Sequence, residues 1–455
     1  MAHENETIVE LVECFMSDQR VILRAVVMNA IEKAIRNGMS PEDVNDAIRP
    51  LLGCTCKQTD YLQARGYLVD HTDLENIDNA ILMSNEALKL HANFGAAKAS
   101  LGEAYWRKYQ LTKDARWTEK AKSECASAVE LGTAGASGHV CLGLIDAGTG
   151  DYAAAAADYQ HAVELDPTSE SAGKGLASAL AQEGKFEEAE AAYQRVIYAH
   201  PQSYFAYNSM GAFYCSRSEY EKAIKMFQKV TELAPENYVG YLNLGGTYND
   251  LGRFLEAIAP LKKSIALHPS YGAYTNLGTS YLGLHKQQEA AAAYEEAVKL
   301  DPKQYVTWGN LGAAQYYGNA RPQSMITYRK AIQLASAELK VNPHDVDILS
   351  DLSMYYANIG DKKTALQYLE QALQFGHNRK ETLACAAQVY NQIGETGLAL
   401  EWMSKAIQAG YAANQFRDLV AFQNLVDNLL GFYRLCSGAL FSYYQPRDSR
   451  SEHWR

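Results

Sequence analysis

Apolar and polar positions alternate along most of this chain with the period of an amphipathic α-helix. In LNLGGTY and EAIAPLKKSIAL, both within residues 238–269, apolar residues recur at positions i, i+3, i+4 and i+7. Turn-forming residues separate these segments: Gly252 follows the first, and Pro269 follows the second. The pattern predicts amphipathic helices joined by short turns.

This pattern repeats at a nearly fixed interval. Six prolines mark it, at successive intervals of 34, 34, 34, 33 and 41 residues: Pro167, Pro201, Pro235, Pro269, Pro302 and Pro343. Three further series run in phase with the prolines, namely Gly211, Gly245, Gly278 and Gly312, then Ala189, Ala223, Ala257 and Ala290, then Tyr214, Tyr248 and Tyr281. A period of about 34 residues indicates stacked helical hairpins, because one hairpin cannot bury its apolar face alone.

The spacing within one unit predicts how each hairpin packs. Glycine at the eighth position and alanine at the twentieth let the two helices approach closely, and Gly252 lies in the turn between them. Pro260 falls inside a second helix, where it removes a backbone hydrogen bond to Glu256. About ten helix pairs are expected to begin near residues 58, 95, 136, 170, 204, 238, 271, 305, 346 and 380. The second pair carries the insertion RKYQLTKDARWTE between its helices, and the eighth has a longer second helix.

The segments that flank the repeats have other patterns. The predicted array covers residues 57–412. Residues 1–56 contain two or three short predicted helices, which form a cap, a docking piece or the remnant of another domain. Residues 413–436 predict a C-terminal capping helix over the last apolar face, and residues 437–455 predict a disordered tail.

Composition narrows the class of protein. Of the 455 residues, 47% are apolar, which is enough for a buried core. The net charge of −11 argues against a dedicated nucleic-acid binder, which needs a basic face. The sequence has no signal-peptide pattern and no apolar run long enough to cross a membrane, so we expect a cytoplasmic protein with no membrane contact. The eight cysteines look scattered, which indicates a reducing compartment, not a disulfide framework.

The sequence offers no catalytic or metal constellation. It contains no phosphate-binding loop, kinase signature, zinc-protease motif or hydrolase nucleophile motif. Cys54 and Cys56 form the only close cysteine pair, and two ligands do not make a metal site. We therefore predict a non-enzymatic protein with no cofactor and no metal.

The first helices of the fifth to eighth units are nearly uncharged. Residues 204–217, 238–251, 271–284 and 305–318 contain only Arg217 and Asp250 as charges, together with twelve tyrosines. Asn243, Asn276 and Asn310 occupy the same position in three successive units, and an amide can both donate to and accept from a peptide backbone. The predicted peptide-binding groove also includes, on the same helical face, Asn208, Asn249, Thr275, Thr279, Tyr316 and Tyr317. The alternative is that these asparagines only order the hairpins.

The 34-residue pattern resembles the tetratricopeptide repeat, with an aromatic residue, then Leu-Gly and Tyr, then Ala and Pro, as in YVGYLNLGGTYNDLGRFLEAIAPLKKSIALHP. This resemblance implies an all-α, right-handed superhelical solenoid whose first helices line a concave surface. The asparagine row is similar to the asparagine ladder of O-linked N-acetylglucosamine transferases, which bind extended protein substrates. LGEAYWRKYQLTKDARW and AELKVNPHDVDILSDLSMYYANIGDKKTALQYLEQAL, followed by ALEWMSKAIQAGY, resemble the repeat region of bacterial eukaryotic-like serine/threonine kinases. That resemblance implies a bacterial signalling context without the kinase domain.

Two functions follow from these observations. The first is a scaffold that binds an extended peptide or protein segment in its concave groove, in bacterial signalling or complex assembly. The second is a regulatory or sensory subunit that docks through residues 1–56 onto a separate kinase, cyclase or transcription regulator. Neither hypothesis fixes the oligomeric state.

Overall fold

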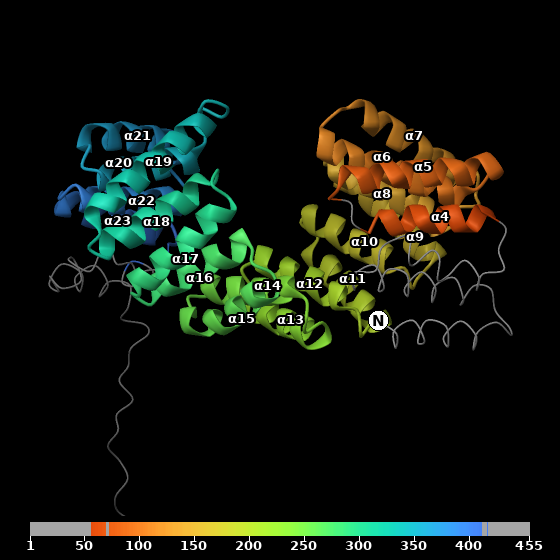
Figure 1. The fold of residues 1–455 in the computed structure, drawn as a ribbon, viewed down its shortest axis with the longest axis horizontal. Coiled ribbons are helices and arrows are strands. Elements are labelled where there is room, and N and C mark those ends of the chain that lie inside the picture. Colours follow the sequence, from red (N-terminus) through yellow and green to blue (C-terminus); the bar gives the residue numbers. More distant parts are fainter. Residues whose placement is uncertain (1–55, 70–71, 412–415, 417–455) are drawn as a thin grey trace, which may run out of the picture. The chain divides into compact units, whose positions relative to one another are not determined.

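The computed structural model describes residues 56–69, 72–411 and 416, and in these residues every regular element is an α-helix (Figure 1). The predicted N-terminal segment 1–56, apart from Cys56, lies outside the described residues. So do the predicted capping helix 413–436, apart from Phe416, and the predicted tail 437–455. The all-α prediction is confirmed over the described chain.

The helices form successive pairs. The first helices of the pairs are α4 (Cys56–Tyr67), α6 (Gly95–Thr112), α8 (Ala136–Thr149), α10 (Glu170–Gln182), α12 (Tyr204–Ser216), α14 (Tyr238–Asp250), α16 (Tyr271–Gly283), α18 (Tyr305–Tyr317), α20 (Val346–Asn358) and α22 (Lys380–Gln392). The second helices are α5 (Leu74–Leu90), α7 (Arg116–Glu130), α9 (Tyr152–Leu165), α11 (Phe186–Ala199), α13 (Tyr220–Leu233), α15 (Phe254–Leu267), α17 (Gln287–Leu300), α19 (Arg321–Leu339), α21 (Lys362–Gly376) and α23 (Thr396–Gln408). All the predicted starting positions from residue 95 onward coincide with observed helix starts.

The chain divides into two compact units, with the boundary after Phe213, inside α12. In the N-terminal unit the two helices of each pair pack together, from α4 with α5 to α10 with α11, and α5 and α9 pack against the following first helices. In the C-terminal unit the pairs α14–α15 to α22–α23 are built in the same way, and each second helix from α13 to α21 packs against the next first helix. This consecutive packing is typical of a repeat solenoid.

Glycine at the eighth position of the first helix permits the close packing within a pair. A Cβ on Gly278 would stand 2.6 Å from the ring of Tyr294, and one on Gly312 would stand 2.9 Å from the ring of Tyr328. All four alanines of the predicted series at the twentieth position are completely buried: Ala189, Ala223, Ala257 and Ala290. The predicted close approach of the two helices is therefore confirmed.

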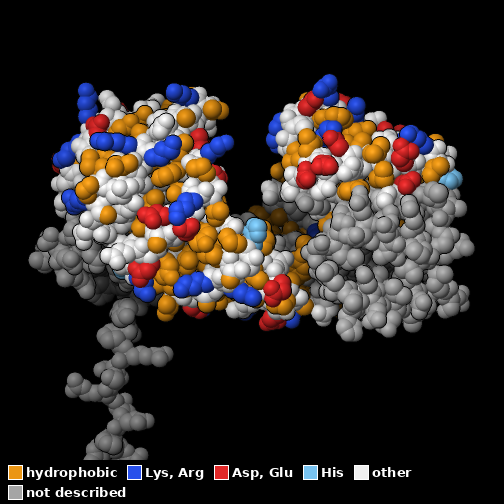
Figure 2. All heavy atoms as spheres, viewed as in Figure 1, with side chains coloured by type: hydrophobic (Ala, Val, Ile, Leu, Met, Phe, Trp, Pro, Cys, Tyr) orange, Lys and Arg blue, Asp and Glu red, His pale blue; other side chains and the backbone are white. Residues whose placement is uncertain are grey.

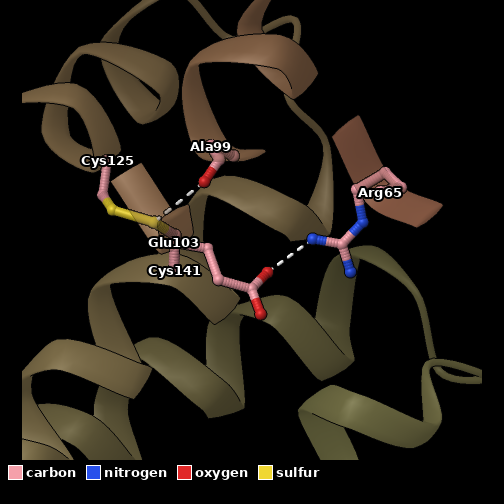
Figure 3. The surroundings of a disulfide bond; sticks show 5 residues. All are labelled: Arg65, Ala99, Glu103, Cys125 and Cys141. Atoms are coloured by element: carbon pink, nitrogen blue, oxygen red, sulfur yellow. Dashed lines mark hydrogen bonds and ion pairs between the residues drawn. A yellow bond between two sulfur atoms is a disulfide. The ribbon is translucent and has the colours of Figure 1, made fainter. Parts of the chain in front are cut away.

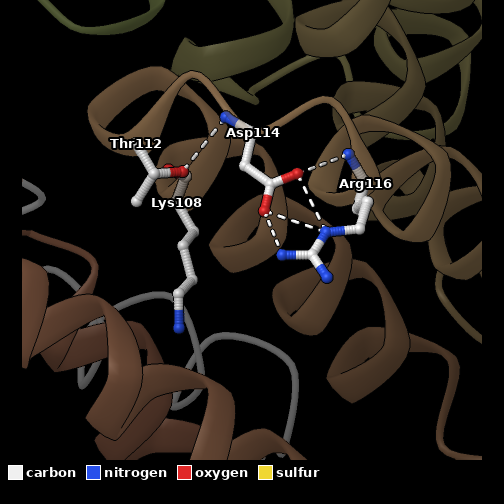
Figure 4. Close-up of polar contacts among 4 residues, drawn as sticks. All are labelled: Lys108, Thr112, Asp114 and Arg116. Atoms are coloured by element: carbon white, nitrogen blue, oxygen red, sulfur yellow. Dashed lines mark hydrogen bonds and ion pairs between the residues drawn. The ribbon is translucent and has the colours of Figure 1, made fainter.

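Two units differ from the common length. The longer second helix predicted for the eighth unit is α19, with 19 residues against 14 in α17. The insertion predicted between the helices of the second unit, residues 107–119, is largely helical, because residues 107–112 extend α6 and residues 116–119 begin α7. The connection to α7 is short, and Asp114 accepts hydrogen bonds there from the backbone N–H and guanidinium of Arg116 (Figure 4).

A disulfide joins Cys125 of α7 to Cys141 of α8, which links two successive pairs in the N-terminal unit (Figure 3). The two Cα atoms are 5.6 Å apart, and both side chains are buried. The expectation of scattered thiols is wrong for these two residues. Their pairing arises from the stacking of consecutive pairs, which places a late position of α7 beside an early position of α8. Cys215 and Cys385 are free thiols.

Replacing Gly278 by alanine is expected to destabilise the C-terminal unit by about 1–3 kcal/mol, because the new methyl group overlaps the Tyr294 ring. The matched control is Gly397→Ala in α23, where a Cβ would meet nothing within 4 Å. That change should stabilise the unit by up to about 1 kcal/mol. Denaturant unfolding of both variants measures the difference, and an equal effect of the two changes would contradict the packing.

The disulfide predicts a specific alkylation result. When the chain is denatured and alkylated without reductant, Cys125 and Cys141 should be recovered in one cross-linked pair of peptides. Closing this loop, with its sequence separation of 16 residues, is expected to stabilise the N-terminal unit by about 3 kcal/mol. Mass spectrometry before and after reduction checks the linkage. Recovery of both residues fully alkylated without reductant would show that the two thiols are separate.

Candidate functional site

The candidate site lies on the first-helix face of the C-terminal unit, which we define as the surface formed by α14, α16, α18, α20 and α22. Asn243, Asn276 and Asn310 are each the sixth residue of their helix and are each half-buried. Within the described chain, the side-chain amides of Asn276 and Asn310 have no hydrogen-bond partner. The structure therefore places the three residues in equivalent positions and leaves two of the amides available.

The amide of Asn276 lies against the preceding repeat. A Cβ on Gly246 of α14 would stand 3.2 Å from Nδ2 of Asn276. Glycine at this position gives the amide room to lie beside the neighbouring first helix. The backbone oxygen of Asn243, one turn before Gly246, accepts a hydrogen bond from the hydroxyl of Thr247 at 2.7 Å.

Asn249 braces two repeats together. Its Nδ2 donates to the backbone oxygen of Asn276 at 2.8 Å, and its Oδ1 accepts from the hydroxyl of Ser280 at 2.7 Å. Both ends of this amide are therefore in use between α14 and α16. The geometry gives Asn249 a role in holding successive first helices in register.

The two threonines of the predicted site differ in their surroundings. The hydroxyl of Thr279 lies 3.1 Å from the hydroxyl of Tyr294 and donates to the backbone oxygen of Thr275. The hydroxyl oxygen of Thr275 is buried and has no hydrogen-bond partner within the described chain. Thr279 thus joins the two helices of its own pair, whereas the hydroxyl of Thr275 is enclosed without a partner among the described residues.

The two predicted tyrosines are the last two residues of α18. The hydroxyl of Tyr316 accepts a hydrogen bond of 2.9 Å from Nε2 of Gln392 on α22, and the guanidinium of Arg321 lies 4.8 Å from the Tyr316 ring centroid. Burial raises the pKa of Tyr317, whose ring meets that of Tyr316 edge-on. Both rings therefore take part in packing within the C-terminal unit.

Asn208, the remaining predicted site residue, lies in α12 on the N-terminal side of the unit boundary and is half-buried. The candidate site described here is built from the C-terminal unit alone.

Sequence reasoning missed Asp351, the sixth residue of α20. It occupies the position that asparagine holds in α14, α16 and α18. Burial raises the pKa of its carboxyl group to about 6, a hydrogen bond from Tyr305 opposes that rise, and Asp347 and Asp345 add to it. The repeat phase could have found this residue, because it follows Asn310 by 41 residues, as Pro343 follows Pro302.

No lysine, arginine or histidine occurs in α14, α16, α18 or α20. The carboxyl groups of these four helices belong to Asp250, Asp347 and Asp351. Figure 2 shows cationic and acidic side chains interspersed with apolar ones on the visible face of each unit. The first-helix face is thus polar and aromatic, and its charges up to α20 are negative.

First helices in the N-terminal unit carry a different chemistry. Glu103 of α6 forms ion pairs with Arg65 of α4 and with Arg107 (Figure 3 shows the first). Burial acts to raise the pKa of Glu103, but the two guanidinium groups outweigh it and lower the pKa to about 2. This network satisfies its own charges and holds α4 against α6.

Neither a metal site nor a membrane-spanning helix occurs in the described part of the chain. Among its residues, no three His, Cys, Asp or Glu side chains are grouped so that they could hold a metal ion. None of the described helices is both long and apolar enough to span a membrane. Cys54 of the close cysteine pair lies outside the described residues.

Four family models described as tetratricopeptide repeat match this chain, at residues 147–211, 216–272, 272–304 and 346–377. Among curated proteins, no sequence matches it. Each matched segment covers one or two of the helix pairs described above.

Several solved structures are similar to parts of the chain. A crystal structure of MamA protein is 24% identical, with a TM-score of 0.30, and the match covers 39% of this chain and 94% of MamA. The human IFIT1 dimer with m7Gppp-AAAA is 17% identical, with a TM-score of 0.48, covering 82% and 86% of the two chains. YrrB, described as a repeat protein with an unusual peptide-binding site, is 18% identical with a TM-score of 0.31, covering 42% and 96%.

The raised pKa of Asp351 predicts a pH-dependent effect of Asp351→Asn. A carboxyl group whose pKa is higher in the folded chain binds its proton more tightly there, so it lowers stability above about pH 6. This penalty shrinks as the pH falls and disappears below 3.8, the ordinary pKa of an aspartate. The variant should therefore raise the free energy of unfolding of the C-terminal unit at pH 8 by up to about 3 kcal/mol, and only slightly near pH 4.

Hydrogen exchange in α20 and denaturant unfolding, each measured from pH 4 to pH 8, check this prediction. The matched control is Asp347→Asn on the same helix, because the Asp347 carboxylate is exposed and paired with Arg379 at 2.8 Å. The control removes a minor part of the repulsion on Asp351 but also loses the pair with Arg379, so its gain in stability at pH 8 should be much smaller than that of Asp351→Asn. A gain for Asp351→Asn that does not change with pH would contradict the assignment.

Proposed function

Because this chain is a tetratricopeptide repeat protein, we propose that it is a non-enzymatic scaffold that binds an extended peptide or protein segment on its first-helix face. The observation that carries the proposal is the row of asparagines at the sixth position of three successive first helices, in which the amides of Asn276 and Asn310 have no partner in the described chain. Unused amides at a repeated position are suited to a ligand that itself repeats.

A peptide backbone is such a ligand. It offers a carbonyl acceptor and an N–H donor at every residue except proline, and an asparagine amide can pair with both. A row of amides at one register therefore holds an extended chain largely without regard to its sequence. Apolar contact area comes from half-buried aromatic side chains on the same helices, among them Tyr241, Tyr274 and Trp308.

The braced residues give the row a fixed frame. Asn249 ties α14 to α16, and Tyr316 ties α18 to α22. With the helices held in register, a bound peptide meets amides that are already placed, so less binding energy is lost in ordering the protein. Asn249 and Tyr316 act in this proposal as positioning residues.

As part of the same proposal, the scaffold works in bacterial signalling or complex assembly in the cytoplasm, and its ligand is a protein and not a nucleic acid. The absence of lysine and arginine from α14, α16, α18 and α20 supports the choice of ligand, because a nucleic acid requires cations to neutralise its phosphates. The disulfide between Cys125 and Cys141 counts against the cytoplasmic part of this proposal, because a reducing cytoplasm keeps cysteines as thiols. Recovery of both residues as thiols in the alkylation experiment would support the cytoplasmic location.

Peptide selection tests the proposal directly. A random dodecapeptide library displayed on phage is selected on the immobilised full chain, on an Asn243→Ala, Asn276→Ala, Asn310→Ala triple variant, and on a Gln374→Ala, Asn378→Ala control. Both control residues are exposed on or after α21. We expect the wild type and the control to enrich the same peptides. Each lost amide should weaken binding by about 0.5–1.5 kcal/mol, so the triple variant should bind roughly a hundredfold more weakly.

Circular dichroism of the triple variant shows whether it stays folded. Equal affinity of the folded triple variant and the wild type would mean that the asparagines only order the hairpins. Failure of the wild type to enrich any peptide would reject the scaffold function on this face.

A further inference from the structure

At Asp351, the residue that continues the asparagine row, the first-helix face carries a negative charge without a neighbouring cation among the described residues. Asp351 follows Asn310 in the row, and the charged groups that act on it are the carboxylates of Asp347 and Asp345. No lysine or arginine in the described chain forms an ion pair with Asp351. Burying a carboxylate without a cation costs free energy, so the folded chain tolerates an unfavourable group at this point.

The two neighbouring carboxylates show that the chain satisfies such groups elsewhere. Asp347 pairs with Arg379 at 2.8 Å. Asp345 caps α20 by accepting hydrogen bonds from the backbone N–H groups of Asp347 and Ile348. Asp351 has neither a cation nor a backbone donor and receives only the hydroxyl of Tyr305.

A hydroxyl group without a hydrogen-bond partner in the described part of the molecule directly precedes two of the row residues. The hydroxyl oxygens of Thr275 and Ser350 are both buried and without a partner in the described chain. Each is the fifth residue of its first helix and directly precedes the row residue, Asn276 in one case and Asp351 in the other. These two hydroxyl oxygens are enclosed and not open to a ligand, so they show only that the position before the row residue is polar in both helices. The groups left for a ligand are the amides of Asn276 and Asn310 and the carboxylate of Asp351.

We propose that the segment bound on the first-helix face carries a lysine or arginine side chain whose cation pairs with Asp351. This inference rests on the proposed function and adds the chemical class of the ligand. The asparagines hold the backbone of the segment, and Asp351 fixes its register by accepting one cation. An acidic segment is disfavoured, because it would meet Asp250 and Asp351 with no cation on α14, α16, α18 or α20 to balance it.

The pairing should be sensitive to pH. The groups that face Asp351 are Tyr305 of α18, Tyr355 of its own helix and Cys385 of α22, together with the carboxylates of Asp345 and Asp347. Burial raises the pKa of both Tyr355 and Cys385, so neither supplies a charge near neutral pH. The cation of the ligand would therefore bind to the ionised Asp351 and would lose affinity as the pH falls through about 6.

The experiment extends the peptide selection to Asp351→Asn. The wild-type chain should enrich dodecapeptides with lysine or arginine at one fixed position, and the variant should enrich peptides without that preference. One enriched peptide is then synthesised together with a version in which glutamine replaces the basic residue. Fluorescence anisotropy with the full chain at pH 7.5 gives the affinities.

A double-mutant cycle decides whether the cation meets Asp351. The glutamine peptide should bind the wild type about tenfold more weakly, Asp351→Asn should weaken the basic peptide about tenfold, and the two changes together should cost about tenfold and not a hundredfold. Asp347→Asn, whose carboxylate already has Arg379, serves as the matched control and should leave the preference for the basic peptide intact.

The outcomes separate this inference from the proposed function. Peptides enriched without a fixed basic residue, or costs that simply multiply in the cycle, would overturn the pairing with Asp351 and leave peptide binding in place. A wild type that enriches no peptide, or that enriches the same peptides as the triple asparagine variant, would overturn both.

Discussion

Close contact between the two helices of each pair is the constraint from which the rest of the structure follows. The contact exists because the eighth residue of the first helix is small. It has no Cβ at Gly278 and Gly312, where aromatic rings of the second helix fill the space, and it is alanine or serine in α10, α20 and α22. Once every pair closes in the same way, the pairs stack in the same register. Residues at one position of successive first helices then form a row, and the asparagine row is a consequence of that register.

Much of the fold could be predicted from the sequence, because each unit is local and its period is explicit. The helix starts follow from the spacing of Pro, Gly and Tyr. Features that depend on contacts between units could not be predicted in this way. The pairing of Cys125 with Cys141 and the bracing of Asn276 by Asn249 both join residues of different units, and nothing in either unit alone signals the partner. Asp351 is an intermediate case, since its place in the row follows from the interval of 41 residues but its missing cation does not.

The two units use the same helical architecture to carry different side-chain chemistry. In the N-terminal unit Glu103 forms ion pairs with Arg65 and Arg107, so these charges hold α4 against α6 and are not available to a ligand. In the C-terminal unit the row residues Asn276, Asn310 and Asp351 have few or no protein partners. A repeat protein can thus keep its packing positions constant while single positions on the first helices are assigned either to stability or to recognition.

The hydrogen bond between Tyr316 and Gln392 has a mechanical consequence. In a stack of repeats that touch only their neighbours, each interface can bend a little independently of the next, and the small rotations accumulate as in a spring. The bond joins α18 to α22 and skips the pair α20–α21 that lies between them in the chain. It therefore limits the total rotation across the two interfaces on either side of that pair, although rotation can still shift from one interface to the other. Bending at one of these interfaces must be compensated at the other, which makes this part of the C-terminal unit behave as a single stiff segment within an otherwise compliant array.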